Sequence, residues 1–361
     1  MTLPMQLALF AGGLVALVAG AELLVRGASK LALAWGVSPL VVGLTVVAFG
    51  TSAPEMTVSV AAVLGGQTEL AIGNAVGSNT FNVLFILGVS ALIVPLAVHV
   101  QVIRQELPIM IGSAVLLLVL ALDGMIGATD GALLLVCLVA YTIFLIRQSR
   151  AESAADAEGY EDLPQPGGKA WVQLVLVAGG LALLVGGSHA LVLAAVGFAR
   201  ALGVSEVVIG LTILAAGTSL PEVAASVAAA IKGQRDLAVG NVVGSCVFNI
   251  LGVIGLAGLA ALPAGLPVPD AVLRFDLWVM LAALVACLPI FVSGREVARW
   301  EGAVFLLYYA AYTAYLILQA QHHAALAPFS SVMMGFVVPL TVVTLVVALF
   351  QRPGAGTAPP R

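Results

Sequence analysis

Apolar runs long enough to cross a lipid bilayer recur along the whole chain, and this feature limits the fold more than any other. A membrane-spanning helix needs roughly 20 predominantly apolar residues. We expect spans near residues 4–25, 38–63, 70–96, 105–122, 130–147, 170–197, 205–231, 237–262, 273–293, 300–319 and 330–350. Only 9% of the 361 residues are charged, whereas a soluble domain carries roughly 25%. We therefore predict an all-α, polytopic membrane protein. A β-barrel would instead show alternating segments of about 10 residues.

The two halves of the chain are copies of one another. Residues 43–82 and 210–249 align without a gap, and 24 of these 40 positions are identical. The similarity extends back to "AGGL" in the first span of each half and forward to "AYT" in the fifth. Each half holds five spans, and an odd number forces the second copy to enter the membrane upside down. Inverted repeats of this kind are a transporter architecture.

These repeats divide the chain into a ten-helix core and an additional C-terminal helix. The long stretch of soluble composition between the halves predicts a linker, which we expect in the cytoplasm. The expected parts are a first five-helix repeat at 1–148 with its motif at 43–82, a linker at 149–169, a second inverted repeat at 170–320 with its motif at 210–249, an extra transmembrane helix at 328–351 and a tail at 352–361.

The basic residues predict an orientation. With the N-terminus outside, twelve of the fourteen Lys and Arg residues fall in inside segments, and only Arg200 and Arg274 fall outside. Cytoplasmic loops of membrane proteins carry an excess of Lys and Arg. We therefore expect a multi-pass protein of a cell inner (plasma) membrane, with its N-terminus outside and its C-terminus in the cytoplasm.

Two of the predicted spans are interrupted by the same motif, "GTSAPE" at 50–55 and "GTSLPE" at 217–222. Glycine and proline break a helix, and each motif places a glutamate, Glu55 or Glu222, inside the membrane. A charged group at the bilayer centre costs at least about 2.5–3.5 kcal/mol. The basic residues lie only at the ends of the spans, so a bound cation is the simplest compensation.

Neutral oxygen atoms surround both glutamates in the sequence. Ser78 and Asn82 in the following span are four residues apart and share one helix face, as do Ser245 and Asn249. Besides these four, the candidate ligands are backbone carbonyls of Ala48, Thr51, Ala215 and Thr218 and hydroxyls of Thr51, Ser52, Thr218 and Ser219. Such a set of hard oxygens suits Ca²⁺. Ser78 and Ser245 could instead serve helix packing, and Asn74 and Asn241 could cap or cross-link helices.

The paired motifs "GTSAPE…GNAVGSNTFN" and "GTSLPE…GNVVGSCVFN" resemble the two α-repeats of the cation/Ca²⁺ exchanger superfamily, and are most similar to those of a prokaryotic Na⁺/Ca²⁺ exchanger. The resemblance covers roughly residues 4–319. It implies that Glu55 and Glu222 are the main Ca²⁺ ligands, that helices one and six slide across the rest, and that Thr51 and Thr218 supply carbonyls. The implied Na⁺ ligands, besides the glutamates, are Ala48, Ser52, Ser78, Ala215, Ser219 and Ser245.

The chain also departs from the family pattern. Members often have Asp at the position of Asn249, whereas here both equivalent positions, 82 and 249, are Asn. Cys246 replaces the usual polar residue after Ser245 and corresponds to Asn79 in the first repeat. The eleventh span lies outside the ten-helix core.

Together these features predict a secondary active antiporter that exchanges Ca²⁺ for Na⁺ by alternating access at a midplane site with two glutamates. Ca²⁺/H⁺ antiport through the same glutamates remains the alternative. An enzyme is not expected, since a hydrolase with Ser52 or Ser219 as nucleophile would lack a His or Lys base within either repeat. We expect no cofactor besides the transported ions, a lipid bilayer as surroundings and no nucleic-acid partner; no oligomeric state is predicted.

Overall fold

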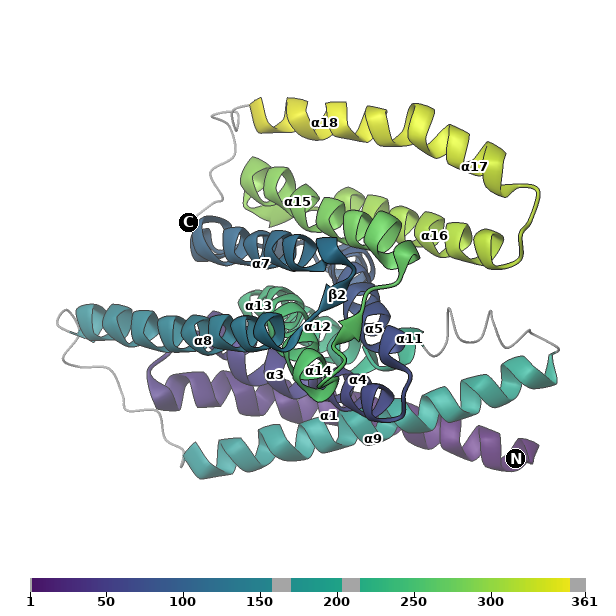
Figure 1. Ribbon diagram of the computed structural model, residues 1–361. Coiled ribbons are helices and arrows are strands. Elements are labelled where there is room, and N and C mark those ends of the chain that lie inside the picture. The colour runs from purple at the N-terminus through teal and green to yellow at the C-terminus, as the bar shows by residue number, and fades with distance from the viewer. Residues whose placement is uncertain (1, 158–169, 203–214, 351–361) are drawn as a thin grey trace.

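The computed structural model describes residues 2–157, 170–202 and 215–350. Figure 1 shows long helices running side by side in roughly one direction. Within the described residues, ten helices are long and apolar enough to cross a membrane. Part of the predicted span near 205–231 lies outside the described residues, as do positions 158–169 of the predicted linker and the whole predicted tail, 352–361. The prediction of an all-α, polytopic membrane protein is confirmed.

Several predicted spans consist of more than one helical element, because turns or π-helical segments interrupt them. The elements of the first half are α1 (Leu3–Trp35), α2 (Pro39–Val42), η1 (Gly43–Val47), α3 (Ala48–Thr51), α4 (Ala53–Leu64), α5 (Thr68–Phe81), η2 (Asn82–Leu87), α6 (Gly88–Ile93), η3 (Val102–Glu106), α7 (Leu107–Leu120), η4 (Ala121–Asp123) and α8 (Ala128–Ala157).

The second half repeats this order as far as it is described. Its elements are α9 (Ala170–Ala201), α11 (Ala215–Gly217), α12 (Leu220–Ile231), α13 (Arg235–Val247), η6 (Phe248–Val253), α14 (Ile254–Ala260), η7 (Val272–Asp276), α15 (Leu277–Gly294) and α16 (Arg299–Ala320). The last span is formed by α17 (Leu326–Val332), η8 (Met333–Val337) and α18 (Val338–Phe350).

Three helices are longer than the sequence predicts. α1 continues to Trp35, where Gly36 adopts a left-handed conformation (φ 62°) that ends the helix. Its 33 residues span about 50 Å at 1.5 Å per residue, whereas the hydrocarbon core is about 30 Å thick. Arg26 and Lys30 mark the end of the apolar run but are themselves good helix formers. α9 has 32 residues, and α8 extends into the predicted linker.

α1 and α9 cross each other as a closely packed antiparallel pair (Figure 1). Gly13 and Gly20 of α1 meet Gly187 and Gly180 of α9. At each of these four glycines, an added Cβ would lie 2.8 Å from the carbonyl oxygen of the opposite glycine. Small residues let membrane helices approach this closely. Because the two glycine pairs occupy equivalent positions of the two repeats, the contact has internal twofold symmetry.

Two short antiparallel ladders, absent from the all-α prediction, join the loops of the two halves. β1 (Leu96–Ala97) pairs with β4 (Glu296–Val297), and β2 (Met125–Ile126) pairs with β3 (Leu266–Pro267). Each ladder has two residues per strand, which is too short to produce a detectable alternation in the sequence. By the order of the spans, the two ladders lie at opposite faces of the helix bundle.

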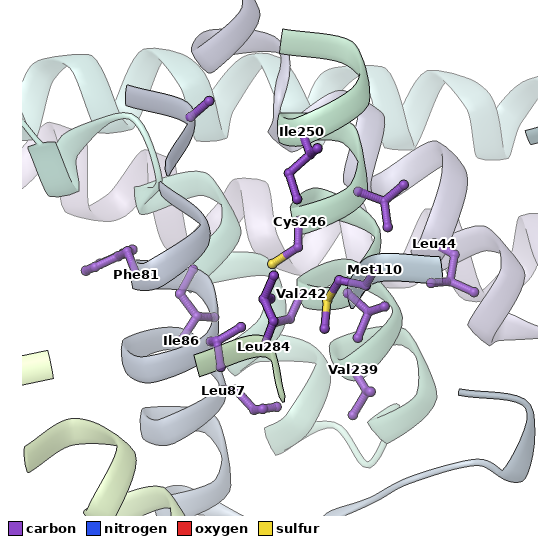
Figure 2. Close-up of a cluster of buried hydrophobic side chains, with 14 of the residues drawn as sticks. Leu44, Phe81, Ile86, Leu87, Met110, Val239, Val242, Cys246, Ile250 and Leu284 are labelled. Carbon is purple, nitrogen blue, oxygen red and sulfur yellow. The ribbon is translucent and has the colours of Figure 1, made fainter. Parts of the chain in front are cut away.

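The hydrophobic core is centred on α13 and the helices around it. Of the apolar window in the span Arg235–Ala260, 89% is buried, against 0% for the last span, Leu326–Val347. In Figure 2, Val242 and Cys246 of α13 lie among Met110 of α7, Leu284 of α15 and Leu87 of η2. The broken helices that carry the two glutamates pack against this core, which holds them in place.

Candidate functional site

Both predicted helix breaks are present. α3 ends at Thr51, Ser52 has a turn conformation (φ −80°, ψ 0°), and α4 begins at the next residue. In the second repeat, Ser219 has nearly the same conformation (φ −90°, ψ 7°) before α12. Glu55 and Glu222 therefore lie in the first turns of α4 and α12. The free N–H groups at a helix N-terminus favour a negative charge at this position.

Each glutamate faces the hydroxyl groups of the other repeat. Glu55 is fully buried, and its Oε1 lies 3.0 Å from the hydroxyl oxygen of Ser219, which can donate a hydrogen bond to it. Thr218 also lies beside Glu55. Glu222, 1% exposed, is approached by the side chains of Thr51 and Ser52. The two carboxyl groups are close enough to interact electrostatically, so the inverted repeats bring both breaks into one site.

Many oxygen atoms of this site are buried without a hydrogen-bond partner among the described residues. They are Oε2 of Glu55, both carboxyl oxygens of Glu222, the hydroxyls of Ser52 and Thr218, and Oδ1 of Asn82 and Asn249. Within the same part of the chain, neither glutamate forms an ion pair, and no three His, Cys, Asp or Glu side chains gather in one place. Burying an unpaired charge costs several kcal/mol. An oxygen-lined site of this kind can be satisfied by a cation.

Asn74 and Asn241 cross-link helices in the same way in both repeats. The Asn74 amide donates to the hydroxyl of Ser59 at 3.0 Å and to the backbone carbonyl of the first glutamate at 3.4 Å. The Asn241 amide donates to Ser226 at 2.9 Å and to the carbonyl of the second glutamate at 3.5 Å. These bonds fix the turn that carries each glutamate. Sequence reasoning did not single out either serine, although both occupy identical repeat positions.

Thr51 joins the first break to α13. Its hydroxyl lies 3.1 Å from Oδ1 of Asn241, to which it can donate, and 3.5 Å from the hydroxyl oxygen of Ser245. It also lies 3.4 Å from the carbonyl oxygen of Ala48. That carbonyl already accepts the backbone N–H of Ser52 at 3.0 Å. Of the predicted ligands in this region, the Ala48 carbonyl is thus engaged by the protein itself.

The two prolines leave other carbonyls without their helical donor. Proline has no N–H for the carbonyl four residues earlier, which is Gly50 in the first repeat and Gly217 in the second. The Gly217 carbonyl accepts a hydrogen bond from Ser188 of α9 at 2.5 Å. The equivalent residue of α1 is Ala21, which has no such donor. Ala215 of the predicted set begins α11, two residues before this carbonyl.

The two asparagines that were predicted as equivalent ligands differ in their surroundings. Asn249 lies in the π-helical segment η6, and its amide donates to Oδ1 of Asn79 at 3.1 Å. Asn79 in turn donates to the carbonyl of Cys246 at 3.3 Å. This contact orients Asn249 and leaves its own Oδ1 unpartnered. Asn82 begins η2 and has no hydrogen bond of this kind among the described residues. Cys246 occupies the repeat position of Asn79, and this difference in the sequence could have indicated that the two asparagines have different neighbours.

Ser78 and Ser245 are both buried beside the breaks. Ser78 is 2% exposed, and its Oγ lies 3.3 Å from that of Ser219. Ser245 is fully buried and lies next to Thr51, as described above. The structure thus gathers the predicted serine and threonine hydroxyls around the two carboxyl groups.

Comparisons with known proteins point to one family. The profile of the family described as "Sodium/calcium exchanger protein" matches residues 5–147 and 172–318. The chain is 38% identical to the putative antiporter CaxA of Alkalimonas amylolytica over 62% of this chain and 71% of that protein. It is 42% identical to the sodium/calcium exchanger MaX1 of Methanosarcina acetivorans, over 32% of each chain.

A solved structure also matches over most of the molecule. The sodium-calcium exchanger NCX_Mj, in a crystal soaked with zero Na⁺ and Ca²⁺, superposes with a TM-score of 0.75 and 29% sequence identity. The match covers 87% of this chain and 100% of that one. The inner membrane protein YrbG of Escherichia coli is 40% identical over 48% of this chain and 54% of its own length.

Proposed function

This chain belongs to the sodium/calcium exchanger protein family, whose members are transporters, and from that premise we propose that it exchanges Ca²⁺ for Na⁺ across the membrane. The observation that carries the proposal is the buried cluster in which each glutamate faces the hydroxyls of the opposite repeat. Both repeats contribute to one site, as alternating access at a repeat interface requires.

The charges of the site explain why transport would be an exchange. One Ca²⁺ carries two positive charges and neutralises both glutamates, while the neutral hydroxyl and amide oxygens complete its coordination. Na⁺ ions can take the same oxygens once Ca²⁺ has left. A site with two ionised and unpaired carboxylates is costly in a low-dielectric interior, so the empty protein would switch slowly. Cation binding thus favours the conformational change, which couples the two fluxes.

The proposed ligands are the predicted ones, and their contributions differ. Glu55 and Glu222 supply the charge, and Ser52, Thr218 and the two asparagines supply oxygens that have no other partner among the described residues. The other hydroxyls form two pairs beside them, Thr51 with Ser245 at 3.5 Å and Ser219 with Ser78 at 3.3 Å. The remaining members of the proposed set, Ala48 and Ala215, contribute only backbone carbonyls. The Ala48 carbonyl accepts the N–H of Ser52, so it would bind an ion through its second lone pair.

The proposed motion is a sliding of α1 and α9 across the other helices. The two helices are packed on each other through four glycines, so they can move as one unit. We propose that the chain lies in a cell inner (plasma) membrane with its N-terminus outside and its C-terminus in the cytoplasm, because twelve of the fourteen basic residues then lie inside. The proposed division of the chain is two five-helix repeats joined by the cytoplasmic linker, followed by the extra helix.

Ca²⁺ uptake into proteoliposomes tests the function. Vesicles loaded with Na⁺ at equal pH on both sides should take up Ca²⁺, whereas vesicles with only a pH gradient should not. Uptake driven by the pH gradient alone would establish Ca²⁺/H⁺ exchange through the same glutamates instead.

Single substitutions test the site within the same assay. Glu55→Gln and Glu222→Gln should each abolish or severely reduce uptake, because each keeps the side-chain shape and removes one of the two charges that balance Ca²⁺. Glu296→Gln, at an exposed acid in β4, is the matched control and should transport normally. Normal Ca²⁺ affinity in either site variant would place the cation elsewhere.

A further inference from the structure

The last span packs on the outside of the ten-helix core and leaves a cavity against it. Figure 1 shows α17 and α18 beside α15 and α16. Tyr308 of α16 fastens the span, since its hydroxyl bonds to that of Thr341 and lies 3.4 Å from the carbonyl of Val337. The remaining space between these helices has a volume of about 630 Å³. This volume lies within the range of roughly 300–1,000 Å³ that is typical of ligand sites.

The cavity is long and its walls are apolar. Its lining on the core side runs from Arg274 to Ile290, which is about 24 Å of helix at 1.5 Å per residue. Ala282 and Ala286 leave room on α15, while Met333 and Val338 close the opposite wall. A space that is long, apolar and parallel to the helices has the shape of an extended hydrocarbon chain.

One end of the cavity carries a positive charge at the membrane boundary. Arg274 lines the cavity in η7, where the chain enters the membrane, and its side chain is 79% exposed. Its guanidinium is 3.7 Å from Asp270, which is longer than a hydrogen bond, so donors remain available. Arginine binds phosphate through paired N–H groups. Trp278, also in the lining and 53% exposed, is the kind of residue found at this depth.

We propose that this cavity binds one phospholipid molecule, with an acyl chain between α15, α16 and α18 and its phosphate at Arg274. The length and the volume of the cavity match an acyl chain, and the cation at the boundary matches the phosphate. The bound lipid would connect the last span to the core through contacts that the two protein surfaces do not make directly. The site is separate from the glutamates, so it does not depend on which ions are exchanged.

Native mass spectrometry of the purified full-length protein tests the proposal. The wild type should retain one phospholipid after detergent exchange. Ala286→Trp, which fills the cavity, should reduce the retained fraction at least tenfold. Val285→Trp is the control, because Val285 neighbours it on α15 but is 44% exposed and outside the lining. Arg274→Gln leaves the apolar walls intact and should reduce lipid retention severalfold. This variant tests the proposal independently if Ala286→Trp fails to fold.

Three results would overturn the proposal. The first is a wild type that releases all phospholipid. The second is equal lipid retention in Arg274→Gln, in a folded Ala286→Trp and in Val285→Trp. The third is a retained mass that belongs to detergent, to another small molecule or to a second copy of the chain.

Discussion

The contact between α1 and α9 allows a prediction in which two neighbouring glycines should behave differently. An added Cβ at Gly187 would lie 2.8 Å from the carbonyl oxygen of Gly13 and 2.9 Å from the backbone nitrogen of Leu17, whereas ordinary contacts begin at 3.4 Å. At Gly186 an added Cβ meets nothing within 4 Å. Both substitutions to alanine gain about the same helix propensity, roughly 1 kcal/mol. The difference between them therefore isolates the packing of the two helices.

Gly187→Ala must separate two backbones by about 0.6 Å, because neither side offers a flexible side chain that could move instead. Overpacking of this kind typically costs about 1–3 kcal/mol. Each kcal/mol shifts the melting temperature by about 2–4 °C in proteins of 150–250 residues, so Gly187→Ala should melt several degrees below Gly186→Ala. The measurement is thermal unfolding of both variants in the same detergent, with size-exclusion chromatography used to monitor the folded fraction at each temperature. Equal melting temperatures, or a lower one for Gly186→Ala, would refute the close contact.

Three further predictions concern the site and the orientation. Asn79→Ala removes the acceptor that orients Asn249, a bond worth about 1 kcal/mol, so half-saturation of Ca²⁺ uptake should rise about fivefold; an unchanged value would show that Asn249 is not a ligand. Asn249→Asp adds a third carboxyl group, and three like charges cannot all stay ionised together. Ca²⁺ transport should therefore become more sensitive to pH between pH 6 and 9. Identical pH profiles of the variant and the wild type would count against the site. Gln67 and Gln234 occupy equivalent turns of the two repeats at opposite faces of the membrane. Each is changed singly to cysteine in a background without the native cysteines, and only Gln67→Cys should react with an impermeant reagent outside intact cells. Labelling of Gln234→Cys alone would invert the orientation.

The sequence predicted the spans well because hydropathy and length alone determine which segments can cross a bilayer. It predicted helix ends less well. Arg26 and Lys30 end the apolar run but not the helix, since a helix can continue beyond the hydrocarbon as far as its cap at Gly36. The two-residue ladders were not predicted, because pairing between distant loops depends on how the halves assemble.

The candidate site was likewise predicted only in part. The repeated motifs identified the two glutamates and the residues beside them, since a charge inside a membrane is exceptional in any sequence. They did not reveal that Ser219 faces Glu55 across the repeats, because that requires the three-dimensional relation of the two breaks. Nor did they predict that Asn79 orients Asn249. A difference between equivalent asparagines appears only when their neighbours are known.

The two strand ladders also bear on the origin of the molecule. Leu96 pairs with Val297, and Leu266 pairs with Ile126, so each partner in one ladder has its repeat counterpart in the other. Residue-for-residue exchange of this kind defines the interface of a twofold dimer. Two separate five-helix chains, inserted in opposite orientations, would form both ladders from a single kind of contact. The linker joins halves that already carry the means to recognise each other, so duplication and fusion of one ancestral half-gene would need no new interface.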